Sequence, residues 1–323
     1  MTSPDLAGRQ RDDQRVRQQS KVESGYSHSD YAASLREFGH PRLLPSSRGW
    51  ILERGVPGHD ACDAMGCYPI FSCRDWALLG SDLHEIGDEL VSLAMVTDPF
   101  GDYSEKLLSD AFPDLVAHFK DHFVADLRQP AKSFVSSHHQ YYARKALEKV
   151  TVERCDHPAE IIDEWSALYS ALVARHRLTG IKAFSRGAFA KQLQVPGMVV
   201  LRARREDETV GAHLWYEEGN VAYSHLTASS PAGYELMATY ALSWKALEYF
   251  ADKVRWIDWG AGAGLTKSGA DGLTRFKRGW ANDSLPAYLC GRIFDHARYL
   301  KLIRAQGSAE SGYFPAYRTN EFR

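Results

Sequence analysis

Apolar residues in the second half of the chain recur at helical spacing in several segments. Ile161, Trp165, Leu168 and Leu172 lie three or four residues apart, which places them on one face of a helix that starts at Pro158 and ends near Gly180. Similar patterns predict further helices over residues 136–147, 184–193, 234–250 and 294–302.

Short apolar runs between these helices predict strands. A hairpin is expected around Glu218-Gly219, with its strands at residues 209–217 and 220–227. Further strands are expected at residues 151–154, 198–203 and 254–259. This order of helices and strands predicts an α+β fold with a mixed sheet flanked by helices.

The first half of the chain has a less regular pattern. Helices are predicted over residues 82–90, 103–112 and 114–127, and a strand over 91–96. Residues 1–38 are rich in Arg, Gln, Asp and Ser and hold few large apolar side chains, which favours a flexible arm. We therefore predict three parts, namely an arm at 1–38, a first half at 39–134 and a second half at 135–323.

Composition narrows the class of protein. The 323 residues are 44% hydrophobic and 25% charged, as expected for a soluble globular protein, and the formal net charge is −2. Such a charge provides no overall field for nucleic acid or anionic lipid. No apolar run is long enough for a membrane span, and the N-terminus has no signal-peptide core, so a cytoplasmic location is expected.

Cysteine usage agrees with that compartment. The five cysteines are an odd number without a secretion signal, which indicates reduced thiols. Cys62, Cys67 and Cys73 lie close to His59, but their spacing is not that of a zinc motif, and packing in a core is the simpler interpretation. No metal is predicted.

A candidate site lies near the C-terminus. An apolar strand that ends at Asp258-Trp259-Gly260 opens into a Gly/Ala-rich turn, and Lys277 follows between Phe276 and Trp280. Amide formation from an activated ester or thioester requires that an oxyanion be stabilised and an amine be deprotonated. Lys277 is the candidate cation for an oxyanion or a phosphate. Alternatively, it is a surface lysine whose stem packs on aromatic rings.

Three further side chains are candidates for the chemistry. Asp258 can orient an acceptor amine or accept its proton, or it can instead bind the N–H groups of the turn that follows. Tyr223 and His225 share one face of a hairpin strand and can deprotonate or bind an amine. A structural role for this histidine is the alternative.

Substrate-binding candidates flank these residues. Ser230-Pro231 is typical of a helix start, whose free N–H groups can face an anion, although simple capping is the alternative. The candidates for binding the donor are Ser229, Ser230, Gly233 and Tyr234. The candidates for binding the acceptor are Asp98 and Asp102, in a cleft between the halves, together with Trp259 and Phe276.

The ordered set of elements resembles the GNAT superfamily of N-acyltransferases, and more narrowly the FemABX group and the related CelD-like acyltransferase domains. The segments that carry this resemblance are residues 139–149, 159–177, 210–213, 229–234, 258–260 and 276–280. The resemblance implies two GNAT-like halves, the first degenerate, and a catalytic role for Lys277. It also implies transfer of an acyl or aminoacyl group to a small-molecule or peptide amine.

The donor stays open at this point. GNAT enzymes that bind acyl-CoA usually carry a Q/R-x-x-G-x-G/A loop, of which this sequence keeps only Gly233. The near-neutral charge speaks against a large tRNA footprint. Acyl-CoA and aminoacyl-tRNA both remain candidate co-substrates, no bound cofactor is expected, and the oligomeric state is open. The alternatives are a non-catalytic GNAT-like scaffold that binds a small molecule, and an envelope-associated transferase that uses a nucleotide-sugar precursor.

Overall fold

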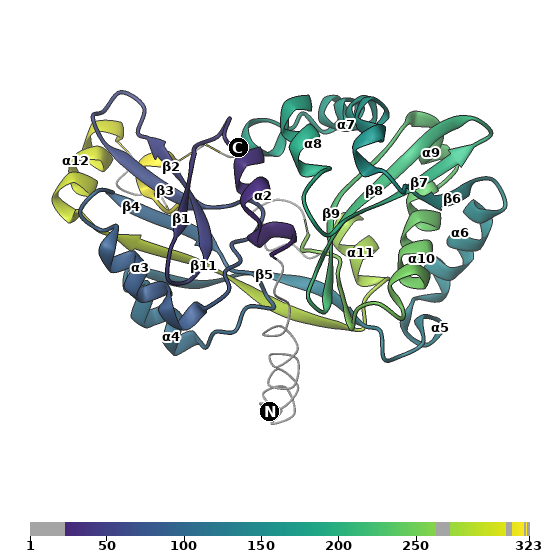
Figure 1. Cartoon of the computed structure of the whole chain (residues 1–323), viewed down its shortest axis with the longest axis horizontal. Helices are drawn as coiled ribbons and strands as arrows, with labels where there is room; N and C mark the ends of the chain where they lie inside the picture. Colours follow the sequence, from purple (N-terminus) through teal and green to yellow (C-terminus); the bar gives the residue numbers. More distant parts are fainter. Residues whose placement is uncertain (1–22, 263–271, 308–311, 320, 322–323) are drawn as a thin grey trace. The chain divides into compact units, whose positions relative to one another are not determined.

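The computed structural model describes residues 23–262, 272–307, 312–319 and 321, and divides into two compact units (Figure 1). Unit 1 consists of Met1–Gly25, Asp121–Arg177 and Gln192–Leu285. Unit 2 consists of Tyr26–Lys120, Leu178–Lys191 and Pro286–Arg323. Each unit is thus assembled from separate parts of the chain. These boundaries differ from the division at residue 134 that the sequence suggested.

Unit 1 contains a mixed sheet with the strand order β5-β10-β9-β8-β7-β6. Strand β10 is parallel to β9 and antiparallel to β5, and the other neighbours are antiparallel. The strands are β5 (Leu115–Asp126), β6 (Thr151–Arg154), β7 (Met198–Arg205), β8 (Glu208–Glu218), β9 (Val221–Ser229) and β10 (Trp256–Asp258). The first residues of β5 belong to unit 2.

The helices of unit 1 cover this sheet. Helices α7 and α10 both pack against β8 and β9, and residues 210–216 of β8 are all buried, so both faces of the sheet are covered. The helical elements are α5 (Ala131–Phe134), α6 (Ser137–Leu147), η3 (Pro158–Ile161), α7 (Ile162–His176), α9 (Pro231–Glu235), α10 (Ala238–Phe250) and α11 (Gly272–Arg278). The core includes Trp215, Phe250, Ile257, Trp259 and Trp280.

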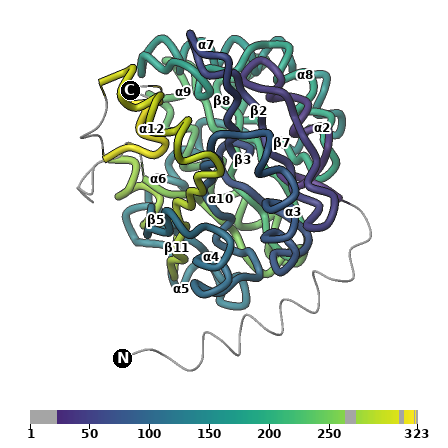
Figure 2. The backbone as a smooth tube through the Cα atoms, turned by 90° about the vertical axis from the view of Figure 1, so that its left-hand side faces the viewer, coloured from purple at the N-terminus to yellow at the C-terminus, as the bar shows by residue number. Residues whose placement is uncertain are grey.

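Unit 2 contains strands in the order β1-β2-β3-β4-β11, in which β3 and β4 are parallel; the first residues of β11 belong to unit 1. Helices α3 and α4 lie side by side in this unit (Figure 1, Figure 2). The strands are β1 (His40–Leu44), β2 (Gly49–Gly55), β3 (Cys62–Gly66), β4 (Ser92–Val96) and β11 (Asp283–Ile293). The helices include α2 (Ser29–Ser34), α3 (Leu79–Glu85), α4 (Glu105–Ala111), α8 (Arg186–Gln192) and α12 (His296–Gln306), with short 3-10 turns at η1 (Gly25–Ser27), η2 (Trp76–Leu78), η4 (Gly180–Lys182) and η5 (Ala316–Arg318).

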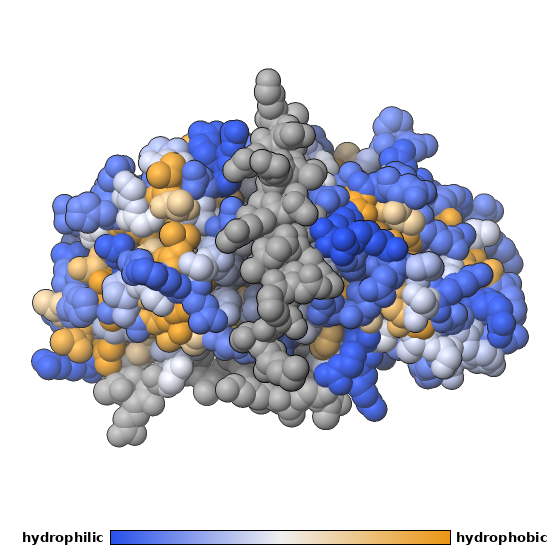
Figure 3. All heavy atoms as spheres, turned by 90° about the horizontal axis from the view of Figure 1, so that it is seen from below, coloured by the Kyte–Doolittle hydropathy of each residue, from blue (hydrophilic) through white to orange (hydrophobic). Residues whose placement is uncertain are grey.

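On the face shown in Figure 3, hydrophilic residues predominate and apolar residues form small groups. Among the described helices, none combines the length and the hydropathy of a membrane span. The large apolar side chains that are exposed belong to different elements: Leu78, Tyr141, Tyr234, Leu273 and Leu300.

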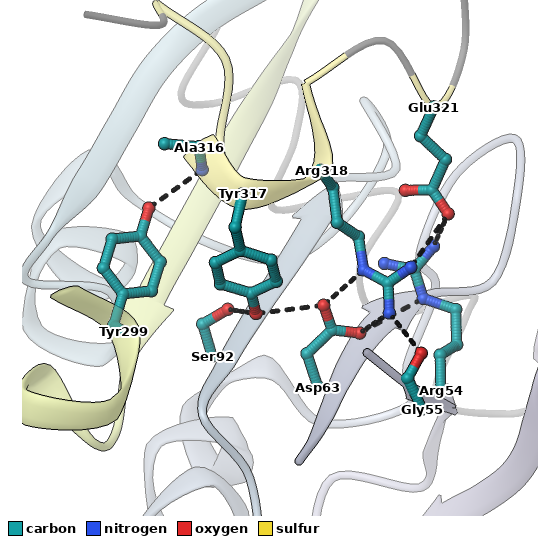
Figure 4. A network of polar contacts seen from close by, with 9 residues as sticks. All are labelled: Arg54, Gly55, Asp63, Ser92, Tyr299, Ala316, Tyr317, Arg318 and Glu321. Atoms are coloured by element: carbon teal, nitrogen blue, oxygen red, sulfur yellow. Dashed lines mark hydrogen bonds and ion pairs between the residues drawn. The ribbon is translucent and has the colours of Figure 1, made fainter. Parts of the chain in front are cut away.

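A buried ionic network fixes the C-terminal segment within unit 2 (Figure 4). The carboxylate of Asp63 is fully buried and accepts hydrogen bonds from the guanidinium of Arg318 and the hydroxyl of Tyr317. Arg54 forms ion pairs with Asp63 at 3.4 Å and with Glu321 at 2.6 Å. Because an unpaired buried charge is strongly destabilising, these ion pairs hold the C-terminal segment against β2 and β3.

Most predicted elements of the second half are confirmed, and so is the α+β class with a mixed sheet flanked by helices. The helix predicted over 114–127 is wrong, because this segment is strand β5, which pairs with β10. Helix α11 and strand β11 were not predicted. Most of the predicted arm, residues 1–22, lies outside the described residues, but its last part contains α2, in which Tyr31 is fully buried.

Candidate active site

The two central strands of unit 1 separate where β10 ends. The last pair of this parallel ladder joins Asp258 to Tyr223, and β9 then continues to Ser229. Along residues 226–229, no described strand lies on the β10 side of β9. A β-bulge lies at the same place, because Leu214 pairs with Leu226 whereas the next residue, Trp215, pairs with Ser224. Extra residues of this kind interrupt the ladder and bend the strand.

Lys277 points back from α11 to the end of β10. Its ammonium donates a hydrogen bond to the carbonyl oxygen of Ala261 at 2.8 Å, and its side chain is half-buried. Gly260 has a φ of +75°, and a Cβ at this position would lie 2.9 Å from the Nζ of Lys277. A glycine is therefore needed both for the turn and for the approach of the lysine. The ammonium is held in place by the backbone and is not a loose surface group.

His139 fixes the start of the segment that carries Lys277. Its Nε2 donates to the carbonyl oxygen of Phe276 at 3.0 Å, and its Nδ1 is 2.6 Å from the hydroxyl of Ser136. Burial lowers the pKa of His139. The neutral ring therefore acts as a donor at one nitrogen and an acceptor at the other. Through these bonds α6 determines where α11 places its lysine.

Asp258 is a buried carboxylate with both oxygens engaged. Its Oδ2 lies 2.8 Å from the Nδ1 of His122 on β5, and its Oδ1 accepts the N–H of Gly260 at 2.7 Å. The bond to the turn matches the structural alternative that the sequence left open. The contact with His122 was not predicted.

Tyr223 and His225 lie in the interior of unit 1. Tyr223 is 2% exposed, and the Nε2 of His225 is 3.2 Å from the Oε1 of Gln192. Burial lowers the pKa of His225 to about 3. A nearby histidine, His213, bonds Ser224 at 2.8 Å, and burial together with the Lys277 ammonium holds the pKa of His213 well below its ordinary value. Both histidines are therefore neutral at pH 7.

The predicted donor loop is largely occupied by its own capping bonds. Ser230 accepts the N–H of Gly233 at 3.1 Å, and its carbonyl oxygen accepts the N–H of Tyr234. Pro231 has no N–H, so the first turn of α9 leaves only the N–H of Ala232 without a partner among the described residues. The hydroxyl of Ser229 bonds Thr239, and the ring of Tyr234 lies against Arg175.

The predicted acceptor residues do not form one group. Trp259 is 2% exposed and packs against Trp280, whereas Phe276 is half-buried beside His139. Asp98 and Asp102 belong to unit 2. There, Asp98 accepts the N–H of Phe100 and contacts Ser72, as a turn residue does, and Asp102 is exposed.

The basic helix α6 borders a surface pocket of about 690 Å³. Its charged residues behave mainly as a solvated face, since Lys145 pairs with Glu148 and Arg144 lies over the ring of Tyr141. The pocket is lined by Lys132, Ser137, Gln140, Tyr141, Arg144, Leu147, Glu148 and Trp244.

Sequence reasoning missed His122 and His139. His122 lay in the segment that was read as a helix, although Phe119, Phe123 and Val124 around it are typical strand residues. For His139 there was a partial indication in the sequence, because Ser136, three residues before it, is a typical N-cap of a helix. Its contact with residues 276–279 had no sequence signal.

Comparisons with known proteins agree with this geometry. Residues 137–278 match the family model of the acetyltransferase (GNAT) domain. No curated protein matches the chain by sequence.

Three solved structures share the fold over most of the chain. FemX has a TM-score of 0.61 and 12% identity, and covers 90% of this chain and 98% of its own. The C-terminal domain of a putative lysylphosphatidylglycerol synthetase from Agrobacterium fabrum has a TM-score of 0.60 and 15% identity, over 92% and 96%. L-PGS from Bacillus licheniformis has a TM-score of 0.56 and 16% identity, over 88% and 98%. Residues 137–278 therefore match the acetyltransferase (GNAT) domain family, and the chain has the fold of FemX.

Proposed function

We propose that the protein transfers an acyl or aminoacyl group from an activated donor to an amine and so forms an amide. One observation carries this proposal. Beside the bulge, β9 runs past the end of β10, and the ammonium of Lys277 is held at the point where the two strands separate. An open strand edge next to a fixed cation suits a carbonyl that becomes an oxyanion.

The open edge of β9, the ammonium of Lys277 and the end of β9 would each serve a different step of the transfer. Backbone groups along residues 226–229 can hold the donor carbonyl in line with the amine. The ammonium of Lys277 stabilises the negative charge of the tetrahedral intermediate or of the leaving group. Ser229, Ser230, Gly233 and Tyr234 then lie at the far end of β9, where the distal part of the donor would bind.

Two donor classes fit this proposal. The acetyltransferase description of the matched family supports acyl-CoA, and the FemABX-like fold supports aminoacyl-tRNA. The acceptor is proposed to be a small-molecule or peptide amine. Trp259 and Phe276 are proposed to shape the acceptor side in unit 1.

The test is a transfer assay with the purified protein. Radiolabelled acetyl-CoA, longer acyl-CoAs and a mixture of charged tRNAs are each incubated with a panel of amines, and amide products are quantified by mass spectrometry. We expect amide from one donor class, at a rate that depends on Lys277. If folded protein forms no amide from any donor, the proposed function is wrong.

A second function is supported by the capped turn of α9. Among the described residues, the N–H of Ala232 alone is left there for an anion, which is less than the donor loop of an acyl-CoA transferase offers. The domain can therefore instead be a scaffold that binds a small molecule without turnover. Equilibrium dialysis with acetyl-CoA distinguishes the two functions. Saturable binding with no amide product in the transfer assay would favour the scaffold.

A further inference from the structure

His122 and Asp258 form a buried pair between two neighbouring strands of unit 1. The Nδ1 of His122 on β5 lies 2.8 Å from the Oδ2 of Asp258 on β10, and the two residues are 9% and 2% exposed. The other carboxylate oxygen accepts the N–H of Gly260 at 2.7 Å. With both of its oxygens bound, the carboxylate has one orientation and so fixes the imidazole as well.

This contact also decides which nitrogen of His122 is basic. A carboxylate only accepts, so the proton of the neutral imidazole resides on Nδ1 and the lone pair is on Nε2. Among the residues that the structure describes, Nε2 makes no hydrogen bond, and the side chain of His122 is 11% exposed. An oriented imidazole with an unused lone pair is a general base.

The pair lies where the proposed reaction would occur. The ladder between β5 and β10 continues past Asp258, since Phe123 donates to the carbonyl oxygen of Gly260 and Trp259 donates to that of Phe123. His122 is therefore next to Gly260, and a Cβ on Gly260 would lie 2.9 Å from the Nζ of Lys277. Tyr223 on β9 is in register with Asp258, and the ammonium of Lys277 on α11 lies at the backbone of Gly260 and Ala261.

We propose that His122 is the catalytic base and that Asp258 is the residue that positions it. This inference rests on the proposed acyl transfer. The Nε2 of His122 takes a proton from the attacking amine while the new C–N bond forms. The tetrahedral intermediate then collapses, and its bond to the sulfur or oxygen of the donor breaks. The imidazolium returns the proton to that leaving thiolate or alkoxide, so the imidazole is neutral again after each turnover.

The test uses the full chain with whichever donor class, thioester or ester, gives amide in the transfer assay. His122→Gln removes the base. Asp258→Asn replaces one of the two oxygens that accept the Nδ1–H of His122 and the N–H of Gly260 with an NH2 group, which cannot accept. His118→Gln is the matched control, because His118 is an exposed histidine on the same strand. Circular dichroism and thermal unfolding establish whether each variant is folded. If His122→Gln is not folded, His122→Asn replaces it in the test.

We expect His122→Gln to lower kcat about 10²- to 10⁴-fold with little change in the KM of the donor. The pH profile of kcat should also differ from that of the wild type. Asp258→Asn should lower kcat at least about tenfold and change the pH profile, whereas His118→Gln should match the wild type.

The outcomes separate this inference from the proposed function. If the wild type forms amide and folded His122→Gln keeps its rate and its pH profile, His122 is not the base, although the proposed function stands. An Asp258→Asn variant that slows the reaction without any change in the pH profile would contradict the positioning role. If the wild type forms no amide from any donor, both proposals are wrong.

Discussion

The imidazole of His139 occupies the space where a side chain of Gly279 would be. A Cβ built on Gly279 lies 2.1 Å from the Cε1 of His139 and less than 3 Å from both ring nitrogens. The ring cannot easily move away, because Ser136 and the carbonyl of Phe276 hold it at both nitrogens. This close packing joins α6 to the segment that carries Lys277.

Gly279→Ala should therefore destabilise unit 1. The added methyl group overlaps the ring, and overpacking of this kind costs about 1–3 kcal/mol. The amide product should also decrease, because the segment with Lys277 must shift. Urea unfolding and the transfer assay measure the two effects. Gly272→Ala is the control, since a Cβ at Gly272 meets no atom of the described residues within 4 Å, and it should change stability by less than about 0.5 kcal/mol. Equal stability of the two variants would contradict this packing.

Lys277→Ala should lower kcat and leave the fold intact. The ammonium donates a hydrogen bond to the carbonyl of Ala261, and loss of an oxyanion stabiliser typically costs about 10²- to 10³-fold in rate. Steady-state kinetics and thermal unfolding are the measurements. Arg275→Ala removes an exposed cation from the same helix and should keep the wild-type rate. A wild-type kcat for Lys277→Ala would remove this lysine from the mechanism.

Buried histidines should make the protein less stable in acid. Burial lowers the pKa of His225 to about 3, below the ordinary value of 6.5. Between these values the unfolded chain binds a proton that the folded chain does not, so stability falls as pH falls. The full contribution is present above pH 6.5, and each such histidine removes about 1.4 kcal/mol per pH unit below it.

Urea unfolding at pH 7, 6 and 5 checks this expectation. His225→Gln should be destabilised at pH 7, because a buried contact with Gln192 changes, but its stability should fall less steeply with acid than that of the wild type. Protonation of carboxylates affects the stability of both proteins equally, so it cancels when the two pH dependences are compared. The same slope in both would show that His225 does not titrate on unfolding.

Asp63→Asn should strongly destabilise unit 2. The substitution leaves two buried guanidinium groups, Arg54 and Arg318, without their shared carboxylate (Figure 4). Breaking a buried ion pair from one side costs about 3–5 kcal/mol. Arg298→Met is the control, because its ion pair with Asp295 is exposed and worth about 1 kcal/mol or less. Urea unfolding monitored by tryptophan fluorescence measures both, and a loss below about 1 kcal/mol for Asp63→Asn would contradict the network.

Sequence patterns correctly predicted the helices and the hairpin whose structure depends on residues close together in the chain. The face formed by Ile161, Trp165 and Leu168 is buried in one helical stretch, and the hairpin turns at Glu218-Gly219 as expected. Strand β5 was misread because its pairing partner is distant in sequence and its burial pattern is not strictly alternating. Helix α11 has only seven residues, too few for a periodic signal.

The candidate site was predicted as a list of residues, and its contacts were not. Lys277 and Asp258 could be named from residue type and position. The partner of Asp258 is His122, 136 residues away, and no spacing within the sequence reveals such a contact. The same holds for His139, because it packs against Gly279, which is distant in the sequence. Asp98 was predicted as an acceptor-binding residue because of its turn motif. In the structure its carboxylate accepts the N–H of Phe100 within that turn.

Strand β10 follows β5 and β9 along the chain, yet it lies between them in the middle of the unit 1 sheet. Until the ribosome has passed Asp258, a nascent chain carries two strands whose inner edges have no partner. Unpaired edges of this kind invite association with other chains. The three residues Trp256–Asp258 thus complete the sheet as well as supply its carboxylate. We expect chains that stop before them to require chaperone protection.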